Sequence, residues 1–441
     1  MTSDQKHDSN QWNIFLQQKA LDFKFTSSQT RVFLARFARD NWLKTIEDTW
    51  RLSDVNSYEA FVKHSTEIYR AIKPYCCPEI GTGSGKFPRA RDWLLEEFNQ
   101  QQDNYFSPID SSFTRAKIAA ECEQAILQPG ALIRIKAPRK MGKSRLLNHI
   151  LNFAEQQNFS TVHINLLKIE KSKFANLDQF LRWFCIYISD ALQLSLDLDQ
   201  YWHQDRGSML SCTMYLEAVL ANSDRPLVLG LDEVDRLLNY PDISQDFFYL
   251  LRSWHEEANN DELWEQLRLA VVYSTEDFGT LDINQSPFNV GLPVELQPFD
   301  LPEMANLAET YGLKFSDRNL EQLMLMLGGQ PYLVDLAMSY LASNSEIKLA
   351  QLLEQATTDT GIYNSYLWQH LINLKSNSQL LQVYLEVLNS SAAIQIDIVA
   401  AYQLYRMGLI KWSKDNTVMP SCELFRQYFL PRLQLTTANY N

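Results

Sequence analysis

The sequence lacks two features that would assign it to familiar classes of protein. No apolar run approaches the ~20 residues that a membrane-spanning helix needs, so we expect no membrane span. Nor is there a basic excess, because 40 lysines and arginines stand against 53 acids and the net charge is −13. A protein that coats nucleic acid nonspecifically needs the opposite balance, so only a local basic patch remains open.

Cysteine is also scarce, and no pair has the spacing of a zinc site. Without a signal peptide, such cysteines are typical of reduced thiols, and we expect a cytoplasmic protein. The six are Cys76, Cys77, Cys122, Cys185, Cys212 and Cys422. Apolar residues are plentiful at 46%, so a chain of 441 residues can build the cores of two to four domains.

A strand, a tight loop and a helix are predicted in residues 131–147. A phosphate-binding loop requires this context, because the N–H groups at a helix start point at one place and the helix dipole favours an anion there. Lys143, which we expect to be solvated and not part of the core, would reach the β- and γ-phosphates of ATP, and the Ser144 hydroxyl would ligate Mg²⁺.

The loop departs from the pattern G-x-x-x-x-G-K-[ST] at its first position, where Ala137 replaces glycine. Alanine fits there if the backbone keeps a conformation that L-residues allow. The predicted nucleotide-binding residues are Ala137, Pro138, Arg139, Lys140, Met141, Gly142, Lys143, Ser144 and Arg145.

An apolar run of strand length, residues 226–233, ends in Asp232 and Glu233. The run is typical of a buried central strand in a parallel sheet, and carboxylates at its end would lie in the crevice where α/β sheets bind ligands. Asp232 would hold Mg²⁺, and Glu233 would orient or polarise the attacking water. The alternative is a core strand followed by a solvated turn.

A third buried run, residues 267–275, ends in the hydroxyls of Ser274 and Thr275. Either could sense the γ-phosphate or bind the attacking water, and either could equally cap a helix. Strands alternate with helices over residues 105–299, which predicts an α/β core with a mostly parallel, three-layer sheet. We expect residues 284–298 to form a loop.

Residues 1–100 predict several short helices, as in a small helix-turn-helix-like module whose own core contains Val32, Phe33 and Phe37. Such a module can read DNA or dock a protein. Its basic residues are scattered among acids, so we favour a protein partner.

Residues 300–375 predict a helical lid with helix starts at Asp300 and Ser316. Residues 376–435 have the order helix, helix, hairpin, with a short strand at residues 394–396 between the two helices, and this is the layout of a winged helix. The helix that would read DNA, residues 397–407, holds Arg406 as its single base, which is poor for phosphate contacts. We therefore expect this domain to pack back on the ATPase core.

From about residue 105 to 433 the chain resembles the AAA-like ATPase family common in cyanobacteria, which is similar to the STAND class of signalling ATPases and to archaeal-type ATPases with a winged helix. The resemblance rests on the blocks LQPGALIRIKAPRKMGKSRLL, FLRWFC, PLVLGLDEVDRL, DFFYLLRSWHEEA, LRLAVVYSTE, INQSPFNVGLPVEL, GGQPYLV, TGIYNSYL and VMPSCELFRQYF.

The resemblance implies an ATP-dependent switch. In it, Lys143 and Ser144 bind phosphate and Mg²⁺, Asp232 and Glu233 form the acidic pair, and Pro331 is the lid residue near the adenine. The resemblance identifies no arginine finger. Arg252, which follows the acidic strand, is a candidate for that role.

We therefore predict a P-loop ATPase that serves as a regulatory switch in bacterial defence or stress signalling and acts through a protein partner of the N-terminal module. A homo-oligomer remains open. The rival is a DNA-associated ATPase of the initiator or transposition type, which would use its winged helix. A third alternative is a nucleotide-binding scaffold with negligible turnover.

Overall fold

The computed structural model describes residues 115–274, 289–358 and 361–437, and in the N-terminal part residues 12, 15–17, 19–20, 22–38, 41, 45–55, 57–76, 87, 90–91, 93–94 and 97. The chain divides into two compact units, Met1–Asp110 and Ser111–Asn441. Among the described residues, no helix combines the length and the apolar character needed to cross a bilayer.

The first unit contains the helices α2 (Ser27–Phe37), α3 (Ile46–Arg51) and α4 (Tyr58–Cys76). The threonines just before α2 and α3 cap them by accepting backbone N–H groups. Val32, Phe33 and Phe37 are fully buried in one hydrophobic cluster, which confirms them as core of this unit.

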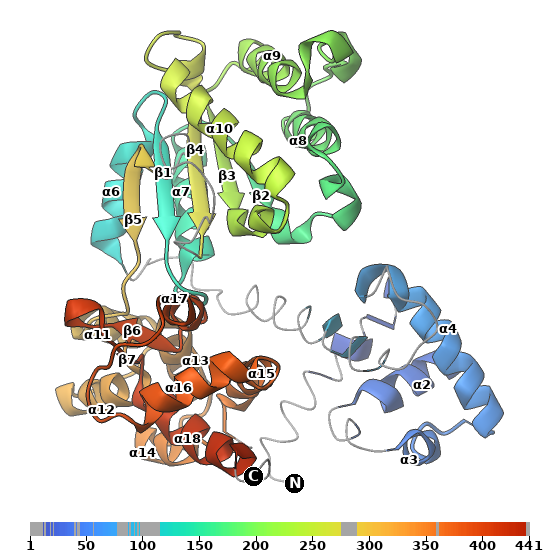
Figure 1. The fold of residues 1–441 in the computed structure, drawn as a ribbon, viewed down its shortest axis with the longest axis vertical. Coiled ribbons are helices and arrows are strands. Elements are labelled where there is room, and N and C mark those ends of the chain that lie inside the picture. The colour runs from blue at the N-terminus through green and yellow to red at the C-terminus, as the bar shows by residue number, and fades with distance from the viewer. Residues whose placement is uncertain are drawn as a thin grey trace. The chain divides into compact units, whose positions relative to one another are not determined.

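The second unit is built on a five-stranded parallel sheet in the order β2-β3-β4-β1-β5 (Figure 1). The strands are β1 (Leu132–Lys136), β2 (Ser160–Asn165), β3 (Leu227–Asp232), β4 (Leu267–Tyr273) and β5 (Leu292–Glu295). Every residue of β3 and β4 is buried, which matches their nearly unbroken apolar sequences.

Helices cover both faces of this sheet. Successive strand residues point to opposite sides, and apolar residues on both sides need to be buried. Ile133 packs with α6 (Ala116–Ile126) and α7 (Lys143–Gln156). Its neighbour Leu132 belongs to the opposite cluster, with α8 (Leu177–Ala191), α9 (Ser208–Ala221) and α10 (Pro241–Glu257). The predicted α/β core with a parallel, three-layer sheet is confirmed.

Strand β5 corrects the prediction of a loop over residues 284–298. It is short, contains Pro293 and buries Val294 alone, so its sequence carries neither an apolar run nor a clear alternation. An edge strand tolerates proline, because one side of its backbone has no strand partner. Residues 284–288 lie outside the described residues.

The C-terminal body, defined here as residues 299–437, is mainly helical. Its elements are α11 (Leu301–Thr310), α12 (Asp317–Leu327), α13 (Pro331–Ser343), α14 (Leu349–Gln355), α15 (Asn364–Lys375), α16 (Ser378–Asn389), α17 (Ile398–Arg406), β6 (Ile410–Trp412), β7 (Val418–Pro420) and α18 (Glu423–Thr437). Asp300 and Ser316 cap α11 and α12 with reciprocal capping boxes, as their sequences predict. The short strand expected at residues 394–396 is a single bridge from Ile394 to Val418.

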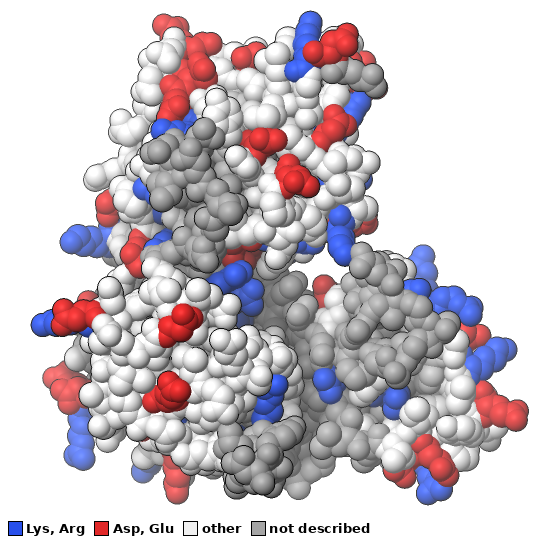
Figure 2. Space-filling model, in the orientation of Figure 1, with Lys and Arg blue, Asp and Glu red and all other residues white. Residues whose placement is uncertain are grey.

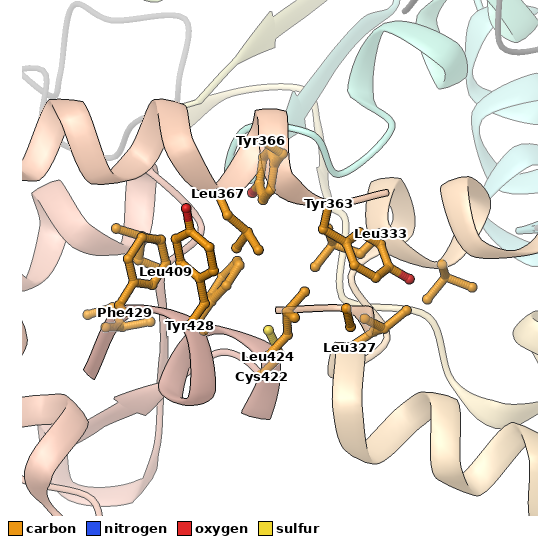
Figure 3. Packing of buried hydrophobic residues seen from close by; sticks show 14 of the residues in the cluster. Leu327, Leu333, Tyr363, Tyr366, Leu367, Leu409, Cys422, Leu424, Tyr428 and Phe429 are labelled. Atoms are coloured by element: carbon orange, nitrogen blue, oxygen red, sulfur yellow. The ribbon is translucent and has the colours of Figure 1, made fainter. Parts of the chain in front are cut away.

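One hydrophobic cluster runs through the whole C-terminal body, from Phe299 to Leu433. Figure 3 shows side chains from both its earlier and later helices, among them Leu333, Leu367 and Phe429, in the same packed group. The segments 300–375 and 376–435 therefore share one core.

Candidate nucleotide-binding site

Four strand ends meet at one edge of the sheet, because β1, β2, β3 and β4 are parallel neighbours. The loop 137–142 follows β1, and Asn165 ends β2. Asp232 ends β3, and Ser274 follows β4. The carboxyl edge of an open parallel sheet is where α/β proteins bind ligands.

The loop after β1 has the backbone of an anion cradle. Lys140 (φ 64°) and Gly142 (φ 89°) adopt left-handed conformations, and α7 begins at Lys143. Successive backbone N–H groups in such an alternating conformation form a concave nest for anions, ahead of the positive end of the helix dipole. Ala137 is not among the residues with positive φ, so its position does not require glycine.

Lys143 is buried, with 5% of its surface exposed, whereas we expected it to be solvated. Its Nζ donates to the carbonyl oxygens of Ala137 and Pro138, both at 3.0 Å. A buried ammonium needs such acceptors, and the loop's own carbonyls provide them. Burial also lowers the pKa of Lys143, although Glu233, Asp235 and Asp232 raise it.

The residues around Lys143 differ in exposure. Ser144 and Arg139 are exposed, and Met141 is buried. Arg145 lies 3.8 Å from a carboxylate oxygen of Asp335 on α13, so the first turn of α7 faces the C-terminal body.

Asp232 and Glu233 stand next to one another but have different surroundings. Asp232 is buried, and it accepts the N–H of Glu233 at 2.9 Å and the side-chain amide of Asn165 at 3.4 Å. Glu233 is half-buried in a left-handed conformation (φ 57°) that turns the chain into the 3-10 helix η6 (Val234–Asn239). Burial raises the pKa of Glu233, with a smaller opposing effect from Lys143.

Asp235, which sequence reasoning missed, connects the strand ends. It is 3% exposed, and one of its oxygens accepts the backbone N–H of Ser274 at 3.3 Å. The other pairs with Arg406 of α17 at 3.2 Å. The sequence signal that could have identified Asp235 is its position, three residues after Asp232 in the turn that follows the strand.

The C-terminal body contacts the phosphate-loop segment directly, as the prediction that it packs back on the core requires. The N–H of Arg139 donates to the carbonyl of Arg406 at 3.3 Å. The ammonium of Lys140 lies 4.4 Å from the ring centre of Tyr332 on α13. The hydroxyl of Tyr405 on α17 lies 3.5 Å from a carboxylate oxygen of Glu295, the last residue of β5.

The remaining predicted residues have mixed outcomes. Ser274 is buried, and its hydroxyl has no hydrogen-bond partner within the part of the chain that is described, whereas Thr275 lies outside that part. Pro331 is buried at the first position of α13, directly before Tyr332. Arg252 pairs with Glu256 on its own helix, α10.

The carboxylates at the strand ends do not by themselves form a metal-binding site. Among the described residues, no group of three or more histidine, cysteine or acidic side chains could hold a metal ion. An exposed hydroxyl at Ser144 and a carboxylate at Asp232 are nevertheless the kind of sparse set that suits Mg²⁺, which takes most of its other ligands from phosphate and water.

Comparisons with known proteins agree with this architecture. The model of the family described as "AAA-like domain" matches residues 105–431. A Walker-type ATPase of Pyrococcus abyssi superposes with a TM-score of 0.50 at 14% identity, covering 71% of this chain and 95% of that one. The ORC2 protein of Aeropyrum pernix, in ADPNP–ADP complexes, gives 0.43 at 16% identity, covering 76% and 98%.

An uncharacterized WD repeat-containing protein of Synechocystis is 23% identical over 320 residues. The match covers 65% of this chain and 26% of that protein, so the chain spans about a quarter of the length of this relative.

Proposed function

The chain belongs to the AAA-like domain family, and on that basis we propose that it binds ATP with Mg²⁺, hydrolyses it slowly and works as a regulatory switch. The observation that carries the proposal is Arg406, which joins the C-terminal body to both parts of the site. Its guanidinium pairs with Asp235, and its carbonyl accepts the N–H of Arg139 in the phosphate loop.

Each residue of the site has a role in this proposal. The backbone of residues 137–142 cradles the phosphates, and Lys143 exchanges its two carbonyl partners for phosphate oxygens. Ser144 and Asp232 would hold Mg²⁺, which would neutralise charge on the phosphates. The carboxylate of Glu233 would orient the attacking water, and the Ser274 hydroxyl would bind that water or sense the γ-phosphate. Pro331 borders the adenine.

The proposed switch depends on the charges where the C-terminal body contacts the strand ends. We call this contact the seam; it includes the pairs Arg139–Arg406, Asp235–Arg406 and Lys140–Tyr332. Phosphate groups above the loop add negative charge close to Arg406, Arg139 and Lys140, so ATP tightens the docking of α17 on the core. Hydrolysis followed by release of the γ-phosphate would remove part of that charge and loosen the docking. A ligand can shift such an equilibrium only through different affinities for the two states, and these cations supply the difference.

Hydrogen exchange can test the proposal, because the Arg139 amide bonds across the seam. With ATP and Mg²⁺, the Glu233→Gln chain should exchange this amide and those of α17 more slowly. The Lys143→Ala chain is the control and should show no ATP effect. Equal exchange with and without ATP in the Glu233→Gln chain would contradict the switch.

The surface of α17 is not suited to contact DNA phosphates. Arg406 is the single base of α17 and pairs with Asp235, while Ile398 and Val399 on the same helix are 52% and 55% exposed. Figure 2 shows basic and acidic side chains interspersed on the face that it draws. We propose that a protein partner docks on the unit Met1–Asp110. A salt titration checks the DNA alternative, because specific contacts to phosphates weaken steeply with salt.

Turnover separates the switch from a scaffold. We propose that phosphate release is slow but measurable and depends on Glu233. Release that is equally low in the native and Glu233→Gln chains would favour a scaffold with negligible turnover.

A further inference from the structure

A cavity of about 560 Å³ lies beside β2, outside the phosphate-binding loop. Its floor and walls come from the end of β2, the following segment 166–173 and the outer side of α8. The residues that matter for its chemistry are His163, Asn165, Lys168, Lys173, Trp183 and Tyr187. The loop 137–144, Glu233 and Ser274 are not among its lining residues, and the cavity adjoins the nucleotide site through Asn165, whose amide donates to Asp232.

Contacts within the fold brace two walls of this cavity. β2 is an edge strand, and the Tyr187 hydroxyl donates to the carbonyl of His163 at 3.1 Å. On the other wall, Arg236 of η6 donates to the carbonyls of Leu166 and Ile169. The guanidinium of Arg236 also lies 4.6 Å from the ring centre of Phe174, which fixes the segment that carries both lysines.

Two aromatic rings line the α8 side. The ring centres of Trp183 and Tyr187 are 5.4 Å apart, and their planes are inclined by 42°. Tyr187 is 40% exposed, so its ring is available to a ligand. Aromatic side chains of this kind stack on nucleic-acid bases, because every base has a planar face.

Positive charge lines the opposite side. Lys168 and Lys173 are exposed at the cavity, where Glu170 is the acid among the lining residues. The chain as a whole carries a net charge of −13, so a site with two lysines and one acid runs against its overall balance. An ammonium is a compact point charge that pairs well with phosphate.

We propose that this cavity binds a phosphorylated ligand with a planar ring, of the size of one nucleotide. The ring stacks beside Tyr187 and Trp183, and the phosphate meets Lys168 and Lys173. The volume falls within the range of roughly 300–1,000 Å³ that small-molecule sites occupy. A free mononucleotide and one residue of a single-stranded nucleic acid share this chemistry.

Calorimetry with the full chain tests the site, using AMP and a twelve-residue single-stranded oligo(dT) as probes, and adenosine and inorganic phosphate as the two halves of the ligand. AMP or the oligonucleotide should bind more tightly than either half. Binding by AMP alone identifies a free nucleotide as the source, and tighter, salt-sensitive binding by the oligonucleotide identifies a nucleic acid.

Variants separate this cavity from the phosphate loop. Tyr187→Leu, and Lys168→Ala combined with Lys173→Ala, should each weaken binding by about tenfold or more, as the loss of a stacking ring does. Tyr187→Phe keeps the ring but loses the hydroxyl that donates to the His163 carbonyl, so it should retain more binding than Tyr187→Leu. Lys171→Ala, at an exposed lysine of the same segment that does not line the cavity, should bind normally.

Lys143→Ala should also leave this binding unchanged, although it removes ATP binding at the loop. The inference is overturned if no probe binds at millimolar concentration, or if binding is lost in Lys143→Ala and kept in Tyr187→Leu and the double lysine variant. Unfolding curves for each variant verify that the fold is intact.

Discussion

Lys143 and Arg406 are two cations near the same group of carboxylates, yet they come from different regions and are held differently. Lys143 begins α7, is buried and bonds to its own loop. Arg406 ends α17, has a side chain that is 41% exposed and reaches Asp235 from another body. A group fixed within the sheet region is suited to binding, whereas a group that arrives with a separate body can report whether that body is docked.

The largest effect on ATP affinity is expected from Lys143→Ala, which removes the buried cation at the start of α7. ATP affinity should fall on the order of 100-fold or more, because several charge-assisted hydrogen bonds to phosphate are lost together. Calorimetry measures it, with Lys411→Ala, an exposed lysine of β6, as the matched control. Unchanged affinity in Lys143→Ala would remove the loop from the site.

Glu233→Gln should spare ATP binding but reduce kcat by roughly 10²-fold, as expected when a general base is lost. Steady-state phosphate release and ATP titration together measure the two effects. Asp232→Asn is the contrasting variant, since it should weaken Mg²⁺-dependent binding itself. Hydrolysis at the native rate in Glu233→Gln would make Glu233 a structural residue.

Arg406→Ala should have a smaller effect, because its side chain is partly exposed and solvent screens the pair with Asp235. We expect ATP affinity to fall about fivefold, or about 1 kcal/mol, and the ATP-dependent protection of the Arg139 amide to disappear. Arg318→Ala, an exposed arginine of α12, controls for lost surface charge. If Arg406→Ala keeps the protection, the contact with Asp235 does not carry the switch.

The smallest expected effect is on the pH dependence of the stability of the fold. Burial raises the pKa of Glu233 above its ordinary value, so the folded chain favours its protonated form. The residue therefore stabilises the fold at pH below its unfolded pKa, and this contribution is lost as the pH rises through the folded pKa. Glu233→Gln should have a higher Tm than the native chain at pH 7, and the gap should shrink toward pH 4. A gap that widens on acidification would contradict this environment.

The sequence predicted those parts of the fold and site that depend on local pattern. The strand before Asp232 is an unbroken apolar run, and the loop before Lys143 has its glycine at the position that needs positive φ. It missed β5, whose four residues include a proline and bury one side chain. The roles assigned to the site residues remain predictions.

Contacts between distant segments could not be predicted in this way. Asp235 and Arg406 are 171 residues apart, and their pairing depends on how a separate hydrophobic core docks against the sheet. The burial of Lys143 likewise arises from the closed loop and the segments around it, and no neighbouring residue in the sequence signals it.

In the proposed switch, the single hydrophobic cluster from Phe299 to Leu433 would make the response to nucleotide cooperative. Tyr332 on α13 and Arg406 on α17 both contact the phosphate-loop segment, and close packing ties their helices to one another. A movement of the C-terminal body as a unit would therefore release both contacts together. Graded changes in ATP concentration would then alter the fraction of molecules in each of two arrangements, and half-released forms would not be populated.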